Sequence, residues 1–180
     1  MSILKPSNGW VVLAIIICWQ VVASLFFIVG PYPVIAEMNI GPLPEERFGY
    51  QASELATWLE DLGDAGRTLY QQFQLLDIIN AVVAAVALSI GLSFVLTRLF
   101  PADHWVQSAK WLPAAVFVLE VVENLLLYTN TSSYPDLTMA SLISAITIIK
   151  LILGFGSMLL FVIFAIWSLV KFFRSRKASG

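Results

Sequence analysis

Charged side chains stand inside the longest apolar segments of this 180-residue chain. Two glutamates lie one helical turn apart in Glu120-Val-Val-Glu123-Asn124, and Lys150 interrupts a later apolar run. Each charge near the centre of a bilayer costs roughly 2.5 to 3.5 kcal/mol, so we expect the charges to be paired. A carboxyl group beside an ammonium group is suited to acid/base chemistry such as proton transfer or isomerisation. Glu120, Glu123 and Lys150 are therefore candidate catalytic residues.

A second group of polar residues recurs every three or four positions along one predicted helix, and this spacing places them on one face. Its members are Arg67, Tyr70, Gln74, Asp77 and Asn80. Together with Asn124 they are the candidate ligand-binding residues of a buried polar pocket. We expect the ligand to be small and amphiphilic or lipid-like, and to enter laterally between the helices.

The depths of these residues can be compared with the helical rise of about 1.5 Å per residue. Counted from the ends of the predicted spans, Asp77 and Lys150 lie at the same level, and Glu123 comes within reach of Lys150. Glu120 lies about one turn deeper. Three carboxylates then face one ammonium group, or two cations if Arg67 reaches inward. The surplus acid favours an exchangeable proton, a bound cation, or a hydroxyl or amine of a ligand.

Other functions explain the same buried charges. Polar side chains also hold membrane helices together, so a non-catalytic subunit or stabiliser of a larger membrane complex is the first alternative. A proton-coupled transporter assembled as an oligomer is the second. Whether the protein is an enzyme at all stays open at this point.

The composition excludes several cofactor-dependent chemistries. Cys18 is the one cysteine, so a disulfide framework within the chain and a Cys-x-x-Cys redox pair are both excluded. His104 is the one histidine, which excludes bis-histidine haem and multi-histidine metal sites. We expect no cofactor and no metal. The net charge of -2 makes nucleic acid an improbable partner.

The segments that carry these candidate site residues are predicted to be membrane helices. Hydrophobic residues make up 59% of the chain and charged residues 12%, whereas soluble domains have roughly 25% charged residues. Apolar runs long enough to cross a bilayer predict an all-α integral membrane four-helix bundle that forms a single domain over residues 1–180. The predicted spans are 9–29, 69–97, 111–130 and 139–170. Gln20 and Ser24 are expected to mark the inward face of the first span.

The distribution of charge predicts the orientation in the membrane. Most basic residues flank one side of the predicted spans: Lys5, Arg98, Lys110, Lys171, Arg174, Arg176 and Lys177. Since cytoplasmic loops retain positive charge, both termini are predicted to be cytoplasmic.

The predicted outer loop, residues 30–66, divides into two halves. Its first half contains four prolines, which we expect to prevent a regular helix: Pro31, Pro33, Pro42 and Pro44. Its second half has apolar residues at i, i+3, i+4 and i+7, which predict a short amphipathic helix: Leu55, Trp58, Leu59 and Leu62. This helix is either a lid on the bundle or a docking surface.

The polar pattern from Tyr50 onward resembles that of a family of small four-span bacterial membrane proteins with no assigned activity. The resemblance rests on Gly66-Arg67-x-x-Tyr70 followed by Asp77, on Glu120-x-x-Glu123-Asn124 and on Lys150. It implies a four-helix fold in a bacterial plasma membrane. The family usually has aspartate where this chain has Glu120. Membrane lipids, a membrane-protein partner and a second copy of the chain are the expected partners.

Overall fold

The computed structural model describes residues 9–132 and 136–178 and confirms the all-α class. Within these residues, helices long and apolar enough to cross a membrane lie in four segments. They correspond to α1 (Gly9–Ile28), α4 (Gly63–Leu99), α5 (Leu112–Ser132) with the turn before it, and α6 (Leu137–Ala178). At about 1.5 Å per residue, α4 and α6 are longer than the ~30 Å of hydrocarbon that they would cross.

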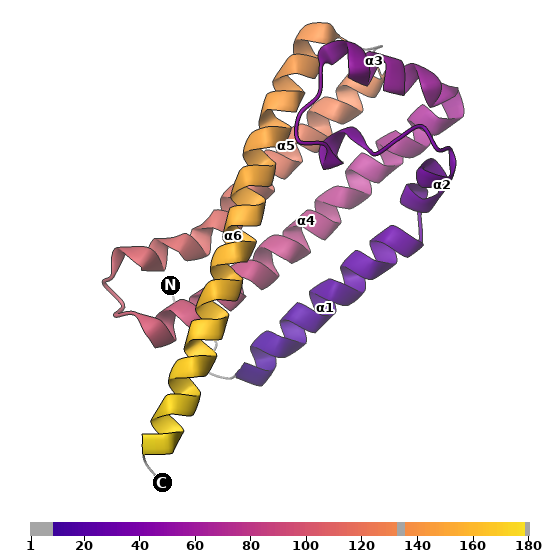
Figure 1. The fold of residues 1–180 in the computed structure, drawn as a ribbon. Helices are drawn as coiled ribbons and strands as arrows, with labels where there is room; N and C mark the ends of the chain where they lie inside the picture. The colour runs from indigo at the N-terminus through magenta and orange to yellow at the C-terminus, as the bar shows by residue number, and fades with distance from the viewer. Residues whose placement is uncertain (1–8, 133–135, 179–180) are drawn as a thin grey trace.

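Helix α4 is the central helix of the arrangement (Figure 1). Helices α5 and α6 pack against it and against each other, whereas α1 lies at the flank and packs mainly on α4. Gln20 and Ser24 of α1 are exposed, so the expectation that they face the bundle axis is wrong. The side of α1 that contacts α4 includes Val12 and Phe26 instead. Because α1 is apolar around its whole circumference, its sequence does not mark a packed face.

The outer loop contains two helices and a short 3-10 turn: α2 (Pro31–Glu37), η1 (Pro44–Glu46) and α3 (Ala52–Asp61). Helix α2 contradicts the expectation that prolines keep the first half of the loop non-helical. Pro31 and Pro33 fall in its first turn, where backbone N–H groups have no partner within the helix. Proline therefore costs the helix no hydrogen bond at these positions.

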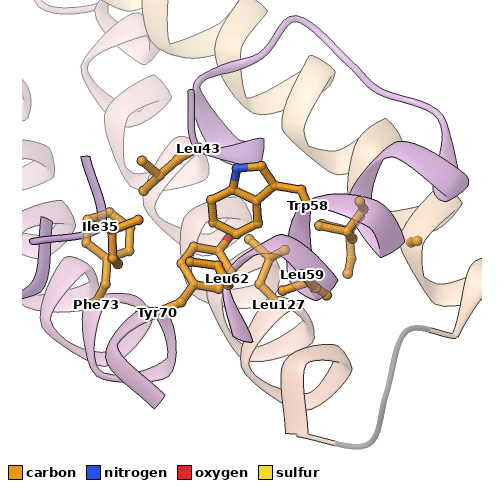
Figure 2. Packing of buried hydrophobic residues seen from close by; sticks show 11 residues of the cluster. Ile35, Leu43, Trp58, Leu59, Leu62, Tyr70, Phe73 and Leu127 are labelled. Atoms are coloured by element: carbon orange, nitrogen blue, oxygen red, sulfur yellow. The ribbon is translucent and has the colours of Figure 1, made fainter. Parts of the chain in front are cut away.

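Helix α3 confirms the predicted amphipathic helix. Leu55, Trp58 and Leu59 are at most 3% exposed, and Figure 2 shows the Trp58 indole packed against Tyr70 of α4. The outer apolar cluster joins α3 to the loop, α4, α5 and α6, and consists of Ile35, Leu43, Leu55, Trp58, Leu59, Leu62, Tyr70, Phe73, Leu127, Ala140 and Ile143. Helix α3 thus covers the end of the bundle at which residues 30–66 lie.

The opposite end of the bundle has a smaller apolar cluster of Leu92, Val95 and Leu96. A 3-10 helix, η2 (Trp105–Trp111), lies beside it. The Gln107 side chain donates hydrogen bonds of 3.2 to 3.3 Å to three backbone carbonyls, those of Leu96, Phe100 and Pro101. These bonds join η2 to the last turn of α4 and to the two residues that follow it. Buried charged and amide side chains lie between the two apolar clusters, and we call them the polar layer.

Candidate functional site

Lys150 of α6 is the cation of the polar layer. It is 6% exposed, and its Nζ donates a hydrogen bond of 2.9 Å to Oε1 of Glu120. It also forms an ion pair with Glu123, whose carboxylate is fully buried and accepts a further hydrogen bond from the Thr147 hydroxyl. The predicted contact between Lys150 and Glu123 is confirmed.

Asp77 of α4 is bound by amides rather than by the ammonium group. Asn124 Nδ2 donates to Asp77 Oδ2 at 3.1 Å, and Asn80 Nδ2 donates to Asp77 Oδ1 at 3.3 Å. No ion pair joins Asp77 to Lys150 in the part of the chain that the structure describes. Counting residues from the helix ends estimates depth, but contact also requires that two side chains point toward each other.

Glu45 of η1 is a member of the polar layer that sequence reasoning missed. It comes from the outer loop, yet it is 7% exposed. The Tyr70 hydroxyl donates to its Oε2 at 2.7 Å, and Gln74 Nε2 donates to its Oε1 at 2.9 Å. Two candidate ligand-binding residues are thus hydrogen-bonded to a carboxylate of the loop.

The environment of Glu45 disfavours its ionised form. The pKa of Glu45 is raised to about 7, mainly because burial disfavours the charged form and also because the carboxylate of Glu123 is nearby, while hydrogen bonds from the backbone and from Tyr70 and the charge of Lys150 oppose the shift. A carboxyl group with a pKa near neutrality exchanges its proton under physiological conditions.

The backbone around Glu45 is fixed on both sides. Arg47 donates two hydrogen bonds, of 3.0 and 2.7 Å, to the carbonyl oxygen of Pro42. Gly49 has a φ of 90°, and a Cβ atom there would lie 2.9 Å from the Ile148 side chain. The Tyr50 amide then donates to the Ser144 hydroxyl at 2.9 Å, which anchors the loop to α6.

Arg67 does not join the buried charges. It forms an ion pair with Asp64 and donates a hydrogen bond of 2.9 Å to the Leu59 carbonyl, so it links α4 to α3 at the outer end. Among the described residues, the buried or half-buried carboxylates of the polar layer are therefore Glu45, Asp77, Glu120 and Glu123, and the cation of this layer, Lys150, pairs with the last two. The acid surplus is larger than the sequence predicts.

A cavity of about 80 Å³ lies beside the Lys150 ion pair, between α4, α5 and α6. Most of its wall is apolar or small, and Glu120 is its one charged lining residue in the described chain: the lining comprises Ala81, Ala84, Ala85, Leu88, Pro113, Val116, Phe117, Glu120, Gly154 and Ser157. The Glu120 side chain remains 17% exposed. Cavities of ~150 Å³ bind benzene, so this one holds only a few heavy atoms.

The structure therefore divides the nine predicted site residues into groups. Among the catalytic candidates, Lys150 contacts both Glu120 and Glu123. Asp77 is bonded to Asn80 and Asn124, Tyr70 and Gln74 bind Glu45, and Arg67 lies apart. No cluster of three or more His, Cys, Asp or Glu side chains in the described segments is arranged to hold a metal ion.

No protein-family model matches this chain, and neither a curated protein nor a solved structure matches it. The functional argument therefore rests on the geometry of the polar layer and its cavity.

Proposed function

We propose that this membrane protein binds the polar end of a small amphiphile in the cavity beside Glu120. The observation that supports this proposal is that Glu120 both accepts a hydrogen bond from Lys150 and lines a cavity whose other walls are apolar or small. The second Glu120 oxygen is available to a ligand, and the neighbouring helix surfaces accommodate an apolar chain.

The charges of the site select the chemistry of the ligand. Lys150 is held between two carboxylates, and further acids lie in the same layer, so a ligand carboxylate or phosphate meets net negative charge. A hydroxyl or amine group donates a hydrogen bond to Glu120 instead. Because the cavity is small, the polar end occupies it and the chain of the ligand extends between the helices into the lipid.

Any proton transfer to this ligand passes through Glu120. Glu123 has no exposed surface, and its carboxylate is bound by Lys150 and Thr147, so it serves to hold Lys150 in place. Lys150 in turn stabilises negative charge on Glu120. Isomerisation of a bound amphiphile by proton transfer is the reaction that this arrangement favours.

Filling the cavity tests the proposal. The purified protein in lipid nanodiscs is photolabelled with a diazirine-bearing long-chain primary amine, and labelling is compared with that by the long-chain carboxylate of equal length. We expect the amine to label the residues around Glu120. Gly154→Leu places a side chain in the cavity and should lower this labelling about tenfold. Glu120→Gln should lower it by a similar factor, because the ligand then loses a hydrogen bond to a charged group.

Gly156→Leu is the matched control, since a Cβ atom at Gly156 has no neighbour within 4 Å and this residue does not line the cavity. This variant should label like the wild type. Equal labelling of wild type and Gly154→Leu, or equal labelling by the amine and the carboxylate, would contradict the proposal.

We also propose that the protein lies in a bacterial plasma membrane with both termini in the cytoplasm, as the flanking charges and the family resemblance predict. Glu45 is too buried for a labelling probe, so the test uses exposed residues on a Cys18→Ala background. In intact cells an impermeant maleimide should label Ser53→Cys on α3 but not Ala102→Cys in the turn after α4. Labelling of both variants from the same side would refute the topology.

A further inference from the structure

An unpartnered amide lies in the middle of the flanking helix α1. Gln20 is exposed, and its side chain forms no hydrogen bond within the described residues. It lies about 16 Å from the Gly9 end of α1 and about 12 Å from the Ile28 end, which is near the centre of the hydrocarbon layer. Lipid offers no hydrogen-bonding partner there, so a partner on another helix stabilises an amide at this depth.

The surface around Gln20 has the residue spacing of a helix-packing site. A shallow, open hollow on the exposed face of α1 is lined by Ile17, Gln20, Val21, Ser24 and Leu25. Residues at i, i+3, i+4 and i+7 form the hole that receives one side chain of a facing helix. Ser24 is small and allows the two backbones to approach closely. These residues lie on the side of α1 away from its contact with α4.

We propose that α1 pairs in parallel with α1 of a second copy of this chain, and that the two Gln20 side chains hydrogen-bond to each other. A two-fold axis along the membrane normal places identical residues at identical depth. A primary amide carries both donors and an acceptor, so it is complementary to itself. The pairing is independent of the ligand proposed for the cavity.

Self-association of the full-length protein in liposomes tests this pairing. Donor- and acceptor-labelled protein is mixed, and energy transfer is measured while the protein-to-lipid ratio is varied. Gln20→Leu should weaken association about three- to tenfold, the range found when polar contacts between membrane helices are lost. Gln72→Leu is the matched control, because it makes the same exchange at an exposed residue of α4 and should leave association unchanged.

Disulfide cross-linking locates the interface independently. Ser24→Cys on a Cys18→Ala background should form dimers on oxidation, because the two Cβ atoms then meet. The native Cys18 is exposed about 120° around the helix from Ser24 and should not cross-link. A monomer at every protein density, unchanged association of Gln20→Leu, or equal cross-linking through Cys18 would overturn the proposal.

Discussion

Replacing Lys150 with methionine is expected to destabilise the folded protein by about 3 to 5 kcal/mol, the usual cost of removing one partner of a buried ion pair. Lys150 is 6% exposed and contacts both Glu120 and Glu123, so its loss leaves two buried carboxylates without their cation. The free energy of unfolding is measured in detergent micelles. Lys171→Met, which removes an exposed lysine from the same helix, should cost much less.

A double-mutant cycle identifies the carboxylate that carries most of this effect. Adding Glu123→Gln to Lys150→Met should recover much of the loss, because removing both charges is less costly than leaving one buried alone. Glu123 is fully buried whereas Glu120 is half-buried, so the coupling of Lys150 to Glu123 should exceed its coupling to Glu120. Coupling below about 0.5 kcal/mol for both pairs would mean that the ion pairs are absent from the folded protein.

Glu45 should make stability depend on pH. Its folded-state pKa of about 7 lies above the ordinary value of 4.5, so between these values the folded protein binds more protons than the unfolded chain. Protonated Glu45 therefore favours the folded state. This contribution to the free energy of unfolding is complete below about pH 4.5 and is lost as the pH rises through 7. At 1.36 kcal/mol per pKa unit, this loss amounts to about 3 kcal/mol.

The variant Glu45→Gln should lack this pH dependence because an amide does not ionise. Between pH 4.5 and pH 8, the difference in unfolding free energy between wild type and variant should move by about 3 kcal/mol in favour of the variant. The other carboxylates titrate in both proteins, so their contribution cancels when the two unfolding free energies are subtracted. Glu37→Gln, an exposed acid of the same loop, should show no such change. An unchanged difference across this pH range would mean that Glu45 is not buried.

The helical architecture could be predicted from the sequence because it depends on short-range apolar patterns. One ion pair could be predicted because a charge inside an apolar span requires a partner at its own depth. Apolar length predicts the long helices, and the depth of Lys150 along its helix predicts its contact with Glu123. The same depth argument placed Asp77 level with Lys150, but in the folded protein Asp77 points toward Asn124. Rotation about the helix axis is set by packing, which residue counting does not include.

Glu45 could not be predicted because nothing nearby in the chain distinguishes it from a solvated acid. It stands next to Glu46, which is exposed, in a proline-rich loop. Its hydrogen-bonding partners Tyr70 and Gln74 are 25 and 29 residues away. The outward position of Gln20 was missed for a related reason, since α1 is apolar on all sides and its packed face depends on α4.

Lys150 is synthesised after Glu120 and Glu123, the two acids with which it pairs. Lys150 follows Glu120 by 30 residues, so at roughly 5 to 20 residues per second it is made roughly 1.5 to 6 seconds later. During that interval α5 carries two acids that have no counter-ion. Helix α5 is therefore expected to enter the bilayer together with α6 as a hairpin, and a nascent chain that stops before Lys150 should leave α5 outside the lipid.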